Sequence, residues 1–156
     1  MDNEIVKRLM WSGMLTASTA LASLLAAIEE TDRTASSPRD KLEAVAGFIV
    51  DSYRHDPELM KVIIVEVTRA ANSFGRTHLP EIRRAYDSIT KIVADGQAAG
   101  AFRSDIDAAF ASMSFYGAIE QLLSGWIFEV IPASATDFEQ AKELVVATIC
   151  DGLEPR

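Results

Sequence analysis

The chain has 156 residues, of which 49% are hydrophobic and 24% are charged, and its formal net charge is -8. This length fits one domain with a sizeable core, and the hydrophobic content excludes a disordered chain. The scattered Lys and Arg argue against nucleic-acid binding by this chain, because several clustered basic side chains are needed to neutralise phosphates. The single cysteine, Cys150, excludes an intramolecular disulfide and suits a cytoplasmic protein.

The N-terminal third predicts two helices separated by a polar loop. Residues 3–30 carry apolar side chains at three-to-four spacing, which is typical of an amphipathic helix. The uncharged part of this segment, residues 10–28, imitates a signal sequence or anchor, but nearby acidic residues and several Ser and Thr within it favour an ordinary helix. Ser37 is a good N-cap and Pro38 fits the first position of the second helix.

The third predicted helix is apolar nearly all round. Asp56 and Pro57 mark its start, and it extends to about residue 72. Its β-branched residues also suit a strand, but its length and its Asp-Pro start favour a buried helix. Glu66 and Arg69 interrupt the apolar run. They form either an internal ion pair or a site that holds the polar end of a ligand.

The fourth and sixth predicted helices have recognisable end signals. Pro80 opens the fourth helix and Gly100 lies where a C-terminal glycine is expected. Thr136 and Glu139 have the spacing of a capping box at the start of the sixth helix, and Gly152 closes it. Since no segment shows the alternation of apolar and polar residues that is typical of a β-strand, the predicted fold class is all-α.

The fifth predicted helix has only one charged residue, Glu120, between residues 108 and 128. Asp105 is its expected N-cap, and Pro132 ends it. Large side chains gather on one face and small ones on the other, so the helix is covered on both sides. A membrane span is disfavoured by the acid near its midpoint. A core helix in a monomer and a helix between two subunits both remain open, and symmetric pairing favours the second. The predicted dimer interface consists of Phe110, Gly117, Gln121, Ser124, Gly125, Phe128, Leu144 and Ile149.

The segment GQAAGAFRSDIDAAFASMSFYGAIEQLLSGWIFE resembles the region around the two C-terminal helices of TetR-type transcriptional regulators. DPELMKVIIVEVTRAAN and LPEIRRAYDSITKIVADGQ are similar to the two helices that precede that region. The resemblance implies a six-helix effector-binding and dimerisation domain over residues 1–156, with the last two helices of each subunit forming a four-helix bundle in a homodimer. The helix-turn-helix headpiece of the family is absent from this chain, so DNA would be contacted only through that missing part.

The same resemblance implies that the chain is part of a repressor and senses a small apolar effector. We expect no membrane as a partner. The fifth-helix pattern is most similar to the acyl-CoA-responsive branch of the family, which implies a long-chain acyl thioester as the ligand class. A filled core without a ligand stays an alternative, as does a headless helical dimerisation or protein-binding module that acts as an antirepressor. No nucleophile and base lie in a recognisable arrangement, so we expect no enzyme, no cofactor and no metal site. The candidate ligand-binding residues are Trp11, Tyr53, Ile63, Glu66, Val67, Arg69, Tyr86, Phe115, Ile119 and Trp126.

Overall fold

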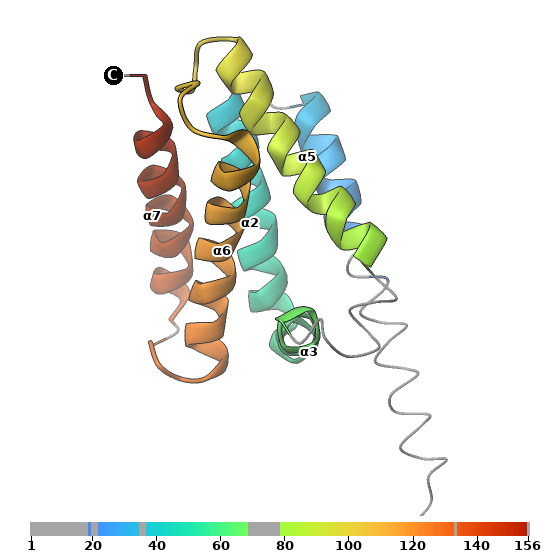
Figure 1. Ribbon diagram of the computed structural model, residues 1–156. Helices are drawn as coiled ribbons and strands as arrows, with labels where there is room; N and C mark the ends of the chain where they lie inside the picture. The colour runs from blue at the N-terminus through green and yellow to red at the C-terminus, as the bar shows by residue number, and fades with distance from the viewer. Residues whose placement is uncertain (1–18, 20–21, 35–36, 69–78, 133, 156) are drawn as a thin grey trace, which may run out of the picture.

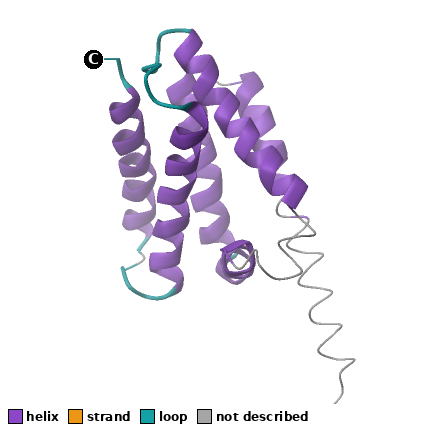
Figure 2. Cartoon of the chain, viewed as in Figure 1, coloured by secondary structure: helices purple, strands orange, loops and turns teal. Residues whose placement is uncertain are grey.

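The computed structural model describes residues 19, 22–34, 37–68, 79–132 and 134–155, and the regular elements in these ranges are all helices (Figure 2). The all-α prediction is confirmed. Besides the helical residues 22–34, the elements are α2 (Pro38–His55), α3 (Pro57–Thr68), α5 (Leu79–Ala98), α6 (Ala108–Ile127) and α7 (Ala135–Leu153).

Helix α2 is the centre of the arrangement, because it contacts α3, α5, α6 and α7. Helices α6 and α7 lie side by side in antiparallel directions, with α7 at one edge of the molecule, and α5 packs against the other side of α6 (Figure 1). Helix α3 follows α2 directly and runs across its end, so it is seen end-on in Figure 1. The buried residues of α2 are Leu42, Val45, Ala46, Ile49, Val50 and Tyr53.

The starts of α2 and α3 are as predicted. The Ser37 hydroxyl accepts a hydrogen bond from the backbone N–H of Asp40 at 3.1 Å, and Pro38 is the first helical residue. The Asp56 carboxylate accepts from the backbone N–H of Leu59 at 3.0 Å. Both caps satisfy backbone donors that have no partner within the helix. The predicted end of the third helix, near residue 72, lies outside the described residues.

The predicted starts of the last two helices were each wrong by a short distance. The N-cap of α6 is Asp107, which accepts from the backbone N–H of Phe110 at 2.9 Å. Asp105 lies too early to cap this helix, and its carboxylate accepts from the Arg103 guanidinium at 2.6 Å. Two aspartates precede α6, and sequence alone does not decide which one becomes the N-cap.

The capping box of α7 is formed by Ser134 and Asp137, whose side chains each accept from the other's backbone N–H. Thr136 is therefore already the second residue of the helix, and Glu139 instead forms an ion pair with Lys142 at 2.9 Å. The prediction chose the second of two overlapping Ser/Thr-x-x-acid patterns. Each pattern would cap the first turn of a helix that starts directly after it, and the first one starts the helix two residues earlier.

The predicted helix ends also shift. Helix α6 ends at Ile127, well before Pro132, because Glu129 adopts a left-handed φ of 56° and the Gly125 carbonyl accepts from the N–H of Val130 at 2.8 Å. Helix α7 continues through Gly152 to Leu153. Gly100, with a φ of 74°, follows α5 as predicted.

The connector between α5 and α6 is packed tightly against both helices. Gly96 has no room for a side chain, since an added Cβ would lie 2.5 Å from the Phe102 ring. The Gln97 amide donates to the carbonyls of Arg103 at 2.9 Å and Ile106 at 2.7 Å. The backbone N–H of Arg103 donates to the Leu153 carbonyl at 2.6 Å, so the connector also holds the end of α7.

The carboxylate of Asp32 links three helices through ion pairs. Its carboxylate accepts from Lys41 Nζ of α2 at 2.8 Å and from Lys91 Nζ of α5 at 2.9 Å. These hydrogen bonds hold the pKa of Asp32 below its ordinary value. In the described ranges of the chain, no helix combines the length and hydropathy of a membrane span.

Candidate functional site

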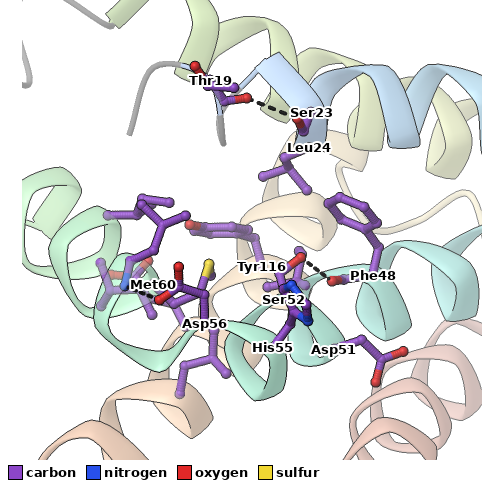
Figure 3. A pocket seen from close by; sticks show the side chains of 16 residues that line it. Thr19, Ser23, Leu24, Phe48, Asp51, Ser52, His55, Asp56, Met60 and Tyr116 are labelled. Carbon is purple, nitrogen blue, oxygen red and sulfur yellow. Dashed lines mark hydrogen bonds between the residues drawn. The ribbon is translucent and has the colours of Figure 1, made fainter. Parts of the chain in front are cut away.

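A cavity of about 670 Å³ lies between the helical residues 22–34 and helices α2, α3 and α6 (Figure 3). This volume falls within the roughly 300–1,000 Å³ that is typical of small-molecule sites. The described residues that line it are Thr19, Ser23, Leu24, Phe48, Ile49, Asp51, Ser52, His55, Asp56, Leu59, Met60, Ile63, Ile64, Tyr116, Glu120 and Leu123.

Helix α2 supplies one wall from a face that lies beside its core face, and Ile49 belongs to both. Phe48, Ser52 and His55 follow each other at helical spacing, so they lie along one side of α2. The Ser52 hydroxyl donates to the Phe48 carbonyl at 2.7 Å, which satisfies it within the helix (Figure 3). This wall therefore presents the Phe48 ring and the His55 imidazole to the cavity.

Helix α3 supplies the apolar wall. The turn at Asp56 and Pro57 carries the chain across the end of α2, and Leu59, Met60 and Ile63 then line the cavity. Ile63 and Met60 are buried while Leu59 is half-buried. The unbranched thioether side chain of Met60 is flexible, so this wall can accommodate apolar groups of different shapes.

Helix α6 supplies Tyr116, Glu120 and Leu123, one helical turn apart. Burial raises the pKa of the Tyr116 hydroxyl well above its ordinary range, and the nearby charge of Glu120 raises it further. Tyr116 therefore stays a neutral hydrogen-bond donor. Its ring meets the ring of Tyr86 edge-on, with 5.2 Å between the ring centroids.

Two of the predicted ligand-binding residues lie at or beside the cavity. Ile63 lines it, and Tyr86 lines a small neighbouring pocket that shares Tyr116 with the large cavity. The side chains of Glu66 and Val67, and the whole of Trp11 and Arg69, lie outside the residues that the structure describes.

The other four predicted ligand-binding residues lie in the packed core instead. Phe115 and Ile119 are completely buried, and the Tyr53 ring stacks on Trp126 with 5.6 Å between centroids. Trp126 in turn packs edge-on against Phe138 at 4.7 Å. Large rings fill space between helices, so they close the core where a cavity was predicted.

Sequence reasoning missed most of the cavity wall on α2. A signal was present, because Phe48, Ser52 and His55 form a second stripe beside the core stripe of the same helix. One apolar ring with polar neighbours is also typical of a solvated helix face. Only the position of α3 across the end of α2 turns that stripe into a cavity wall.

The predicted interface residues all lie outside the core of the single chain. Phe110, Phe128 and Leu144 are 66%, 64% and 56% exposed. Gly117 and Gln121 are exposed as well, and Ser124 and Ile149 are half-buried. Gly125 is different, because an added Cβ would lie 2.9 Å from the Ile131 side chain of its own chain. The absence of a side chain at Gly125 lets the α6–α7 turn fold back onto α6.

The described residues hold no group of three or more His, Cys, Asp or Glu that could bind a metal ion. Cys150 is buried, and burial raises the pKa of its thiol to about 11, so it is mostly protonated at neutral pH.

The family model described as "Tetracyclin repressor-like, C-terminal domain" matches residues 38–149, from the first residue of α2 into the last turns of α7. A search of curated proteins gave no match. Among solved structures, a protein with unknown function from Rhodococcus sp. RHA1 is similar, with a TM-score of 0.68 and 21% sequence identity over 92% of this chain and 72% of that one. That likeness shows a shared fold. Because the family match spans more than half of the sequence, this chain belongs to the family of tetracycline repressor-like C-terminal domains.

Proposed function

We propose that the chain is the small-molecule-sensing and dimerisation domain of a TetR-like transcriptional repressor, and that its effector is largely apolar. The observation that carries this proposal is the cavity of about 670 Å³ whose α3 wall is aliphatic. An effector that binds one conformation of the domain better than another shifts the population between them, and DNA-binding headpieces outside this chain would read that shift.

The dimerisation part of the proposal is supported by the uncovered apolar side chains on α6 and α7. Phe110, Met113 and Leu144 are each more than half exposed on these two helices, which lie side by side (Figure 1). A second copy that covers them would remove this surface from water, at about 25 cal/mol per Å² of apolar area. The long-chain acyl group suggested by the α6 sequence pattern is one candidate for the apolar part of the effector.

The test is to fill the cavity. In Leu59→Trp a larger side chain enters the cavity from α3, while Ala94→Trp places the same ring on the exposed side of α5 as the matched control. Calorimetric titration would use 1-dodecanol below its solubility limit and dodecanoyl-CoA below its micelle concentration. We expect the wild type and the Ala94 variant to bind at least one probe, and the Leu59 variant to bind it at least tenfold more weakly.

The melting temperature of each variant would show that it is folded. Equal binding by the Leu59 variant would place the probe elsewhere and contradict the proposal. A stable dimer that binds neither probe would favour the second candidate function, a helical dimerisation or protein-binding module without a ligand. The exposed apolar side chains of α6 and α7 are the observation that supports this second candidate.

A further inference from the structure

We infer that Tyr116 is a specificity-determining residue of the cavity, because its ring forms the wall at which the apolar chain of a ligand has to end. This inference rests on the proposed function, since it names the residue that sets the length of the apolar group that the sensing domain accepts. Tyr116 limits the ligand by shape, whereas the aliphatic side chains of α3 supply apolar contact area.

The Tyr116 ring stands between two spaces. Besides the large cavity, a small pocket of about 20 Å³ lies between the helical residues 22–34 and helices α2, α5 and α6. Leu24, Ile49 and Tyr116 are the described residues that line both the cavity and the pocket, so their side chains separate the two. The small pocket has room for about one water molecule, which is too little for a ligand by itself. It can extend the binding site only if the wall is removed.

The far side of the small pocket is apolar. Helix α5 contributes Ile82, Ala85 and Ile89, and Ile28 comes from the helical residues 22–34. Ile28 and Ile89 are buried. A space lined by aliphatic side chains accepts hydrocarbon, whereas a polar group would lose its hydration there. The part of a ligand that reaches Tyr116 is therefore its apolar end.

The position of the Tyr116 ring is fixed by α5. The ring packs edge-on against Tyr86, with 5.2 Å between the ring centroids, and Tyr86 itself lines the small pocket. One helical turn before Tyr116, the hydroxyl of the completely buried Ser112 donates to the Tyr86 carbonyl at 3.3 Å. Since these contacts join α6 to α5 at the level of the two rings, Tyr116 cannot move into the small pocket without displacing Tyr86.

A fixed wall predicts a limit in a homologous series of ligands. Each methylene group that leaves water for an apolar site should tighten binding about fourfold. Methylene groups that would extend past Tyr116 find no room, so they should add little affinity. Replacing the ring by the methyl group of alanine joins the cavity to the small pocket, and additional methylene groups can then be buried.

The experiment is a calorimetric titration of the full chain with straight-chain 1-alkanols from 1-hexanol to 1-dodecanol, each below its solubility limit. The variants are Tyr116→Ala and its matched control Tyr116→Phe, which keeps the ring. In the wild type and the control, we expect the affinity to rise with chain length and then to level off within the series. In Tyr116→Ala the rise should continue for at least two more methylene groups, so this variant should bind 1-dodecanol at least tenfold more tightly than the wild type.

Two further comparisons separate an extended site from a loosened fold. The affinity for 1-hexanol should be the same in all three proteins, because a short chain does not need the space beyond the wall. Adding Ala85→Leu to Tyr116→Ala fills the small pocket from α5 and should restore the chain-length limit of the wild type. If the melting temperature shows that Tyr116→Ala does not fold, Tyr116→Leu takes its place, and a smaller shift in the same direction is expected.

The failures of the inference and of the proposed function are distinguishable. If the alkanols bind but the wild type shows no limit, or shows the same limit as Tyr116→Ala, the inference is overturned while the sensing function stands. A gain in affinity that survives the addition of Ala85→Leu also overturns it, because the longer chain then enters some other space. If no alkanol binds, the inference fails, and the sensing function fails with it only if dodecanoyl-CoA is not bound either.

Discussion

Replacing Gly96 by alanine tests the packing of the connector between α5 and α6. An added Cβ would lie 2.5 and 2.9 Å from two carbons of the Phe102 ring and 3.0 Å from the Pro38 Cβ. The ring is 4% exposed, and Pro38 begins the central helix, so neither neighbour is the free end of a flexible side chain. The clash must therefore move a buried ring, the start of α2, or both.

Two opposing effects set the size of the change. Alanine is favoured over glycine in a helix interior by about 1 kcal/mol. Forcing an extra carbon into a packed site costs about 1–3 kcal/mol, and the contact below 3.0 Å places Gly96 towards the upper end of that range. We expect a net loss of about 1–2 kcal/mol in the free energy of unfolding, which corresponds to a fall of about 2–8 °C in Tm for a chain of this size.

Urea unfolding followed by circular dichroism would measure this change. Gly152→Ala is the matched control, because a Cβ there meets nothing within 4 Å, and this variant should be at least as stable as the wild type. Combining Gly96→Ala with Phe102→Leu should relieve the clash, so the two losses should not add. If Gly96→Ala is as stable as the wild type, or if the double variant shows simple additivity, the packing argument is wrong.

Three further predictions concern the surface, the pH dependence and the thiol. Leu144→Glu, which puts a charge on the exposed apolar face, should give a folded monomer by native mass spectrometry, and a dimer of unchanged affinity would exclude this face as the subunit contact. Asp32→Asn should cost about 0.5–1 kcal/mol at pH 7 by loss of its two lysine contacts. Because the folded pKa of Asp32 is depressed, its contribution is present above the ordinary value of 3.8 and disappears as the pH falls through the folded pKa. Urea unfolding at pH 7 and pH 3 should therefore show a smaller difference between wild type and variant at pH 3. Cys150, with its pKa raised from 9.0 to about 11, should carry about a hundredfold less thiolate at pH 8 than in the unfolded chain, so rapid labelling by a maleimide in native buffer would contradict its burial.

Local signals were enough to predict the helical class and several helix starts. Ser37 with Pro38 and Asp56 with Pro57 each combine a capping side chain with a residue that fits the first helical position, so the two signals reinforce each other. At α6 and α7 two possible caps stand two residues apart. Each would satisfy the backbone donors of a helix that starts directly after it, and the choice between them depends on how the connector packs against neighbouring helices, which a local sequence pattern does not indicate.

The cavity could not be predicted from residue size. The prediction placed large rings such as Phe115 and Trp126 around the ligand, whereas Phe115 is completely buried and Trp126 packs against Tyr53 of α2 and Phe138 of α7. The cavity remains because α3 crosses the end of α2 instead of packing along it, so residues of both helices line a shared space. The position of α3 is a tertiary property (Figure 1).

Helix α6 interleaves cavity-lining positions and exposed positions along the sequence, which are its two proposed roles. Tyr116 and Glu120 line the cavity, and the very next residues, Gly117 and Gln121, lie on the exposed face. Since consecutive helical residues point about 100° apart, inserting or deleting one residue in α6 would turn the cavity positions towards the exposed face. Substitutions can alter one role at a time, but a change of length alters both. The length of α6 between Ala108 and Ile127 is therefore expected to be constrained during evolution more strongly than its sequence.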